Sequence, residues 1–141
     1  MRSRQSGVLR GVRYRSAQTR GTAPLLDIYL PEVPNGASVV LVHGGGFVVG
    51  SRQMRPMRFL ASQLQSAGFT AVSIDYRLVS RGGDLDQALD DVRTALAFWC
   101  ERAPTYGLDP RRVSMLGLSA GGMLAMLAAS EVDVQRLVCG F

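Results

Sequence analysis

The feature that most constrains the fold is a series of short apolar runs with helical segments between and after them. Ser38 to Val42, Phe69 to Ile74 and Val113 to Leu116 are continuous runs rich in apolar and β-branched residues. Such runs are typical of strands that are buried on both faces. Because strand and helix alternate, we predict an α/β domain with a mostly parallel sheet, right-handed crossovers and helices on both faces.

The helices and the last strand follow from the same pattern. Apolar residues recur at helical spacing from Met57 to Ala67 and again from Leu85 to Trp99, where Asp84 is placed to cap the helix. Ser119 to Ser130 is predicted as a third helix, and Val134 to Phe141 as a strand. Because an uncovered apolar edge strand pairs readily with other chains, we expect self-association through this last strand.

The 141 residues fit one domain with an unusual beginning. We predict an arginine-rich leader with an edge strand at Val8 to Ser16 for residues 1–24, and the N-terminal portion of the domain for residues 25–141, starting with a strand at Leu25 to Leu30. A solvated leader, a transit peptide and a nucleic-acid contact are all compatible with so many arginines. No aromatic stacking platform accompanies them, so no nucleic-acid partner is expected.

Composition places the chain among globular proteins and excludes several classes. Hydrophobic residues make up 47% and charged residues 19%, with neither a transmembrane run nor a secretory signal, so we expect a cytoplasmic protein without a membrane partner. One histidine and two cysteines, Cys100 and Cys139, supply no ligand cluster. We therefore expect no metal and two buried free thiols. No cofactor is expected either, because the glycine-rich segments lack the spacing of nucleotide-binding loops.

The pattern G-x-S-x-G occurs once, centred on Ser119, between an apolar strand and an apolar helix. A serine on a sharp strand-to-helix turn is exposed at the end of the sheet, and its neighbours must be small because the chain packs closely there. Gly117, Ala120 and Gly121 are small enough. The backbone N–H of Ala120 would then face a developing oxyanion at Ser119.

A second glycine motif, the segment His43-Gly44-Gly45-Gly46, follows the buried strand that ends at Val42. Glycines leave their backbone N–H groups open to a ligand because no Cβ stands in the way. Two donors from this loop, together with the N–H of Ala120, would make a three-donor oxyanion hole.

The segments "HGGGF", "IDYRL" and "GLDPRRVSMLGLSAGG" together resemble the α/β-hydrolase superfamily. Within it the chain is similar to the HGGG-bearing carboxylesterases, namely the hormone-sensitive-lipase-like group and its capless bacterial esterase relatives. The resemblance implies that Ser119 is the acylated nucleophile. It further implies that Gly45, Gly46 and Ala120 supply the oxyanion N–H groups, while His43 and Gly44 shape and support the loop.

The sequence also departs from the pattern of that family. Leu118 stands where many hormone-sensitive-lipase-like members have aspartate, and no long N-terminal cap is present, which favours the capless esterases. Family order is serine, then acid, then histidine, yet no histidine follows Ser119. We therefore expect an N-terminal half, truncated after the sixth strand and lacking the triad acid and base. His43 is not expected to be the base, because the loop backbone would lie between it and Ser119.

Three functions stay open at this point. The first is hydrolysis of a small-molecule carboxylic ester through an acyl-Ser119 intermediate, with an amide substrate as a variant. The second is a catalytically inactive remnant or binding module of the same fold. The third, argued only from the arginines of residues 1–24, is a basic domain associated with nucleic acid.

Overall fold

The computed structural model describes residues 7–16, 21–130 and 136–140. Its elements, in chain order, are β1 (Gly7–Arg13), β2 (Leu25–Leu30), β3 (Ser38–Val42), α1 (Arg55–Ser66), β4 (Thr70–Ile74), the 3₁₀ turn η1 (Val79–Arg81), α2 (Leu85–Arg102), the 3₁₀ turn η2 (Ala103–Tyr106), β5 (Val113–Leu118), α3 (Ala120–Ala129) and β6 (Arg136–Gly140). The predicted strands and helices are therefore present within a few residues of their expected bounds. Residues 134, 135 and 141 of the predicted last strand lie outside the described residues.

The strands form one six-stranded sheet in the order β1-β2-β4-β3-β5-β6. The β3–β4, β3–β5 and β5–β6 pairs are parallel, whereas β1–β2 and β2–β4 are antiparallel. The sheet is thus mostly parallel, as predicted, and the edge strand expected near the N-terminus is β1. Because β3, β4 and β5 are adjacent and parallel, the segments that follow them meet at one end of the sheet.

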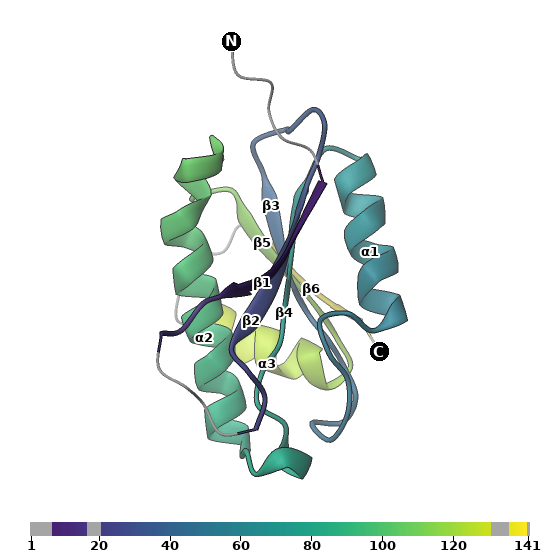
Figure 1. The fold of residues 1–141 in the computed structure, drawn as a ribbon, viewed down its shortest axis with the longest axis vertical. Coiled ribbons are helices and arrows are strands. Elements are labelled where there is room, and N and C mark those ends of the chain that lie inside the picture. The colour runs from purple at the N-terminus through teal and green to yellow at the C-terminus, as the bar shows by residue number, and fades with distance from the viewer. Residues whose placement is uncertain (1–6, 17–20, 131–135, 141) are drawn as a thin grey trace.

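Helices cover both faces of the sheet, with α1 on one face and α2 and α3 on the other (Figure 1). The α1 face is closed by Met57 and Ala61, which pack against Leu41 and Ala71. The other face holds the larger cluster of buried side chains, which includes Trp99 at 0% exposure. In the described ranges no helix combines the length and the apolar character needed to cross a membrane.

Helix α2 begins at the cap that the sequence predicts. The carboxylate of Asp84 accepts the N–H of Gln87 at 2.8 Å, and the side chain of Gln87 accepts the N–H of Asp84 at 3.2 Å, which completes a capping box. Near its other end, Trp99 donates its indole N–H to the hydroxyl of Ser38 at 2.8 Å. The expected burial of Cys100 is only partial, and burial raises the pKa of its thiol.

A buried carboxylate joins α2 to the segment that follows β4. Asp91 accepts the backbone N–H of Arg77 at 2.8 Å and two guanidinium N–H groups of the same residue at 2.9 and 3.0 Å. Arg15 donates to Asp91 at 3.1 Å and to Asp90 at 2.7 Å. The Asp91 side chain is 2% exposed and that of Asp90 is 52% exposed. Asp91 therefore fixes the chain as it leaves β4, while Asp90 is a surface partner.

These two neighbouring aspartates provide a matched test of the packing. Asp91→Asn is expected to destabilise the fold by about 1.5–3 kcal/mol, because it weakens the charged hydrogen bonds of Arg77 and Arg15 and leaves the exposed Asp90 as their remaining counter-charge. Asp90→Asn should cost less than about 1 kcal/mol, as exposed ion pairs do. Urea unfolding followed by circular dichroism measures both changes. Equal losses in the two variants would contradict the assignment of Asp91 as the buried anchor.

Candidate active site

Ser119 lies at the turn between β5, which ends at Leu118, and α3, which begins at Ala120. Its backbone has φ 53° and ψ −119°, in a region that residues with a side chain rarely adopt. Ser119 is the N-cap of α3, yet its side chain makes no capping hydrogen bond and is exposed. The turn thus stores strain of about 1–3 kcal/mol and leaves the hydroxyl uncommitted, as a nucleophile requires.

Two glycines allow α3 to pack against the ends of the neighbouring strands. A methyl group added at Gly121 would lie 2.2 Å from the carbonyl oxygen of Val42 and 2.4 Å from that of His43, and one added at Gly117 would lie 2.3 Å from the carbonyl oxygen of Gly121. No real Cβ tolerates such contacts. The helix therefore starts directly beside the end of β3, and its first N–H groups, including that of Ala120, are at the same end of the sheet as Ser119.

The glycine loop that follows β3 lies in contact with the turn at Ser119. A methyl group added at Gly44 would lie 3.2 Å from Cβ of Ser119 and 2.8 Å from the carbonyl oxygen of Leu118. Gly45 and Gly46 have φ of 127° and 64°, so the loop needs glycine for its conformation as well as for space. The carbonyl of Gly45 accepts the N–H groups of Val48 and Val49 at 3.2 and 3.1 Å, which closes the loop into a tight turn.

His43 is 1% exposed and is committed to the loop. Its Nδ1 lies 2.7 Å from the carbonyl oxygen of Gly44, and because a carbonyl only accepts, Nδ1 carries the proton. The ring stacks on Tyr76 with centroids 4.2 Å apart, and the Tyr76 hydroxyl donates to the carbonyl of His43 at 2.8 Å. Burial lowers the pKa of His43, opposed by the bond to Gly44 and by the charge of Asp75. The imidazole is thus a neutral support of the loop.

The sequence motifs predicted the turn at Ser119 and the glycine loop, but they did not indicate two residues that contact His43. Tyr76 stood within a quoted segment and received no role, although its ring and hydroxyl both contact His43. Gly50 was not singled out either, yet a methyl group there would lie 2.7 Å from Nδ1 of His43. Gly50 follows His43 by seven residues and stands outside the His43–Gly46 motif. A glycine at such a position can indicate that the chain passes close to the histidine ring.

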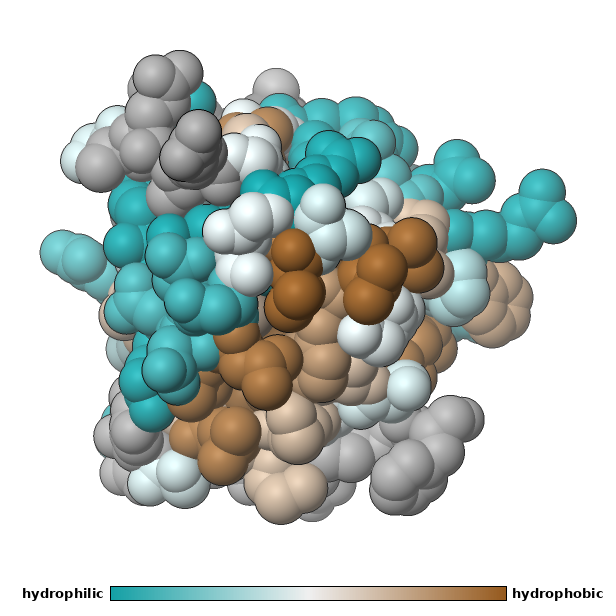
Figure 2. All heavy atoms as spheres, turned by 90° about the horizontal axis from the view of Figure 1, so that it is seen from below, coloured by the Kyte–Doolittle hydropathy of each residue, from teal (hydrophilic) through white to brown (hydrophobic). Residues whose placement is uncertain are grey.

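Apolar side chains are exposed around this end of the sheet. They come from the loop, from η1 and from the first turn of α2, and include Val48 at 50%, Val49 at 62%, Val79 at 46% and Leu85 at 48% exposure. The N–H of Val79 donates to the carbonyl of Phe47 at 2.8 Å, so η1 is tied to the loop. Figure 2 views the lower end of Figure 1, where these elements lie, and shows apolar side chains gathered on that face.

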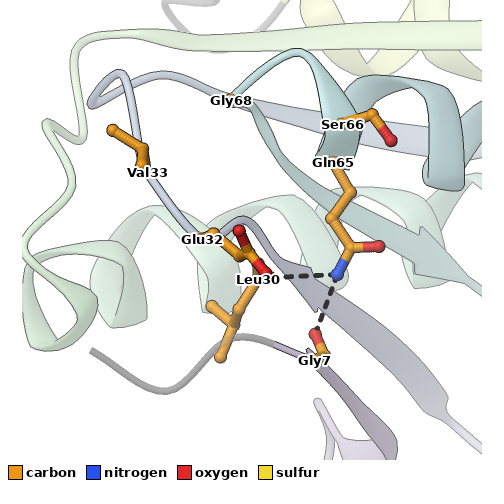
Figure 3. A pocket seen from close by; sticks show the side chains of 7 residues that line it. All are labelled: Gly7, Leu30, Glu32, Val33, Gln65, Ser66 and Gly68. Atoms are coloured by element: carbon orange, nitrogen blue, oxygen red, sulfur yellow. Dashed lines mark hydrogen bonds between the residues drawn. The ribbon is translucent and has the colours of Figure 1, made fainter. Parts of the chain in front are cut away.

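A cavity of about 560 Å³ lies elsewhere, near the start of β1 and the end of β2 (Figure 3). Gln65 spans it by donating to the carbonyl oxygens of Gly7 and Leu30 at 3.2 and 2.9 Å. Gly68, which precedes β4, also lines it, so the cavity is at the end of the sheet opposite to Ser119. Its lining residues include neither a histidine nor a serine with positive φ, so the cavity lacks the features of the turn at Ser119.

Comparisons with known proteins identify the family and the fold of the chain. A family model described as BD-FAE matches residues 26–138 of the chain. An inhibited esterase B from Lactobacillus rhamnosis has a TM-score of 0.74 and 28% identity, with 87% of this chain and 39% of that chain covered.

Two further esterases have similar structures. A thermophilic esterase from Thermogutta terrifontis with propionate bound has a TM-score of 0.68 and 26% identity, with 85% of this chain and 43% of that chain covered. A truncated form of a carbohydrate esterase from gut microbiota has a TM-score of 0.72 and 25% identity, with 89% and 44% covered. The fold is that of α/β-hydrolase esterases, and the chain spans less than half the length of these three proteins.

The contact at Gly121 can be tested by the sign of a stability change. Alanine normally stabilises a helix by up to about 1 kcal/mol relative to glycine, but at Gly121 the added methyl group would overlap two backbone carbonyls. We expect Gly121→Ala to lower the free energy of unfolding by about 1–3 kcal/mol. Met126→Ala, at an exposed position of the same helix, should change it by less than about 0.5 kcal/mol. A stabilised Gly121→Ala variant would contradict the packing.

The lowered pKa of His43 predicts how stability depends on pH. The ordinary pKa is 6.5, so below that pH the unfolded chain binds a proton that the folded chain excludes. The free energy of unfolding should therefore fall as the pH drops from about 7 to about 5.5, by at most about 1.4 kcal/mol per pH unit. His43→Asn removes the group and should flatten this slope in urea titrations. The same slope in both chains would show that His43 is not buried as a neutral group.

Proposed function

The chain belongs to the BD-FAE family of α/β-hydrolase esterases, and from this membership we propose that Ser119 is the nucleophile of a carboxylic ester hydrolase. The observation that carries the proposal is the contact between the two glycine motifs, in which Gly44 lies against Ser119. Ser119 is strained, and its side chain makes no capping hydrogen bond. Together with the glycine loop it supplies both groups that the first step of an acyl transfer needs, a free hydroxyl and nearby backbone donors.

The proposed reaction has two stages. The Ser119 oxygen attacks the carbonyl carbon of the ester, its proton passes to a base, and the carbonyl oxygen becomes an oxyanion. The N–H groups of Gly45, Gly46 and Ala120 receive this negative charge, aided by the N-terminus of α3. The tetrahedral intermediate then expels the alcohol, which takes up a proton, and leaves an acyl-Ser119. Water attacks this acyl group in the second stage, releases the carboxylic acid and returns the proton to Ser119.

None of the residues assigned above serves as the general base or as the acid that orients it. His43 is the single histidine of the sequence, and its Nδ1 is hydrogen-bonded to Gly44 beneath the loop. General-base assistance contributes about 10²–10⁴-fold, and the triad acts as a unit. We therefore infer that the 141 residues alone bind and orient an ester but turn it over very slowly.

The substrate class is argued from the surroundings of Ser119. Exposed Val48, Val49 and Val79 lie on the loop and on the turn tied to it, and they favour an ester whose acyl or alcohol portion is apolar. A small-molecule ester of this kind is the proposed substrate, and an amide with the same acyl portion is its variant.

A second candidate function is binding without catalysis. It is favoured by one observation, the commitment of the single histidine to the loop. The two functions differ in whether Ser119 becomes covalently modified when a base is supplied.

The test uses the 141-residue chain, its Ser119→Ala variant and added imidazole as an external base. Alone, the chain should show at most very slow Ser119-dependent hydrolysis of p-nitrophenyl acetate. With a fluorophosphonate probe, mass spectrometry should detect an adduct on Ser119 whose rate of formation rises with imidazole concentration, because imidazole takes the hydroxyl proton for which we assign no base among the described residues.

Two other outcomes would change the assignment. Labelling that is equal in the chain and in Ser119→Ala, at all imidazole concentrations, would favour the binding function. Fast ester turnover without imidazole, lost in Ser119→Ala, would mean that the chain holds its own base, and His43→Ala would then be the next variant.

A further inference from the structure

A buried ion cluster lies where the glycine loop returns toward α1. Arg52 donates its backbone N–H to Asp75 at 2.7 Å, a guanidinium N–H to the other oxygen of Asp75, and its Nε–H to Asp27 at 2.8 Å. The side chains of Arg52, Asp27 and Asp75 are 14%, 0% and 9% exposed. Three charged groups are therefore withdrawn from water and depend on one another for their hydrogen bonds.

Arg52 is the principal counter-charge of both carboxylates. Asp27 also accepts the backbone N–H of Gly11 at 2.9 Å, and Arg10 approaches it at 3.4 Å. The Arg10 side chain is 52% exposed, so its contribution is screened by solvent. Removal of the Arg52 guanidinium would leave Asp75 and the fully buried Asp27 without their nearest cation.

The cluster and the histidine hold the two ends of one loop. At the start, Tyr76 stacks on His43 and donates to its carbonyl. At the return, Asp75 holds Arg52 by its backbone and its side chain, and the hydroxyl of Ser73 donates to the carbonyl of Arg52 at 2.8 Å. Two consecutive residues directly after β4, Asp75 and Tyr76, thus fix both ends of the segment 43–52.

We propose that Arg52 is a positioning residue, which, paired with Asp27 and Asp75, holds the donors of the glycine loop at the distance from Ser119 that an oxyanion requires. The proposal rests on the proposed function in that it takes the loop N–H groups as oxyanion donors. Glycines have no side chains with which to hold their own conformation, and oxyanion donors act only within a narrow range of distance. The position of the loop is therefore set at its anchored ends.

An arginine is required at this position and a lysine does not replace it. The guanidinium presents several N–H donors in a fixed plane and reaches two carboxylates at once, whereas an ammonium is a single point of charge on a flexible stem. Arg52→Lys should keep the charge but lose part of the hydrogen bonding. Arg52→Ala should lose both.

Amide hydrogen exchange measures how firmly the loop is held and does not depend on any catalytic step. The reporters are the amides of Val48 and Val49, which donate to Gly45, and the core reference is the set of amides in β4 (Thr70–Ile74). In Arg52→Ala the loop amides should exchange at least about tenfold faster than in the unchanged chain, and their acceleration should exceed that of the β4 amides, which report the loss of global stability. Arg52→Lys should give a smaller increase, and Arg58→Ala, an exposed change on α1, none.

Chemical rescue separates positioning from a general loss of stability. Methylguanidinium at millimolar concentration should restore the slow exchange of Val48 and Val49 in Arg52→Ala, because it carries the forked donors that the variant lacks. Tetramethylammonium at the same ionic strength should not. If Arg52→Ala does not fold, the exchange rates of the Val48 and Val49 amides in Arg52→Lys test the proposal instead.

The proposal is overturned if the loop amides of the folded Arg52 variants exchange as in the unchanged chain, or accelerate by no larger a factor than those of β4. The proposed function is judged separately, by fluorophosphonate labelling of Ser119 in imidazole. If Ser119 does not react in the unchanged chain, the proposed function fails while the exchange data still decide the anchoring of the loop. If Ser119 reacts, Arg52→Lys should slow its labelling severalfold in the folded chain.

Discussion

The approach of helix α3 to the end of strand β3 is the contact on which the rest of the structure depends. Gly121 lies so close to the carbonyl groups of Val42 and His43 that no side chain fits between them. This contact places the first turn of α3, the strained Ser119 and the glycine loop at one end of the parallel strands. Without it, the two glycine motifs would be separate turns on one sheet, and neither alone has both a nucleophile and a set of donors for an oxyanion.

Around that contact, arginine and aspartate pairs hold the segments that follow β3 and β4, in addition to the apolar packing of Tyr76 and Leu78. Asp91 binds Arg77 after β4, and Asp75 with Asp27 binds Arg52 at the return of the loop. Every basic residue of the sequence is arginine, and the forked guanidinium suits this use because it joins two carboxylates or a carboxylate and a backbone in one plane. A polar framework of this kind gives a loop of glycines a definite position that its own residues do not provide.

The sequence predicted the parts of the site that local pattern determines. Apolar runs located β3, β4 and β5, small residues around Ser119 indicated the strained turn, and Asp84 was correctly expected to cap α2. The partners of Arg52 could not be predicted, because Asp27 and Asp75 lie 25 and 23 residues away in the chain and meet it only after β2 and β4 pair. For the same reason the role of Tyr76 was missed, and the half-burial of Cys100 depends on how α2 is rotated against its neighbours, which spacing alone does not determine.

The central claim is that the turn at Ser119 and the loop at Gly45 and Gly46 form one oxyanion-binding site. A crystal structure of the chain phosphonylated at Ser119 tests it most directly, because the phosphonyl oxygen stands where the oxyanion would form. We predict that this oxygen accepts hydrogen bonds of about 2.7–3.1 Å from the N–H of Ala120 and from N–H groups of the loop. A phosphonyl oxygen that points into solvent, with the loop donors beyond hydrogen-bond distance, would contradict the account.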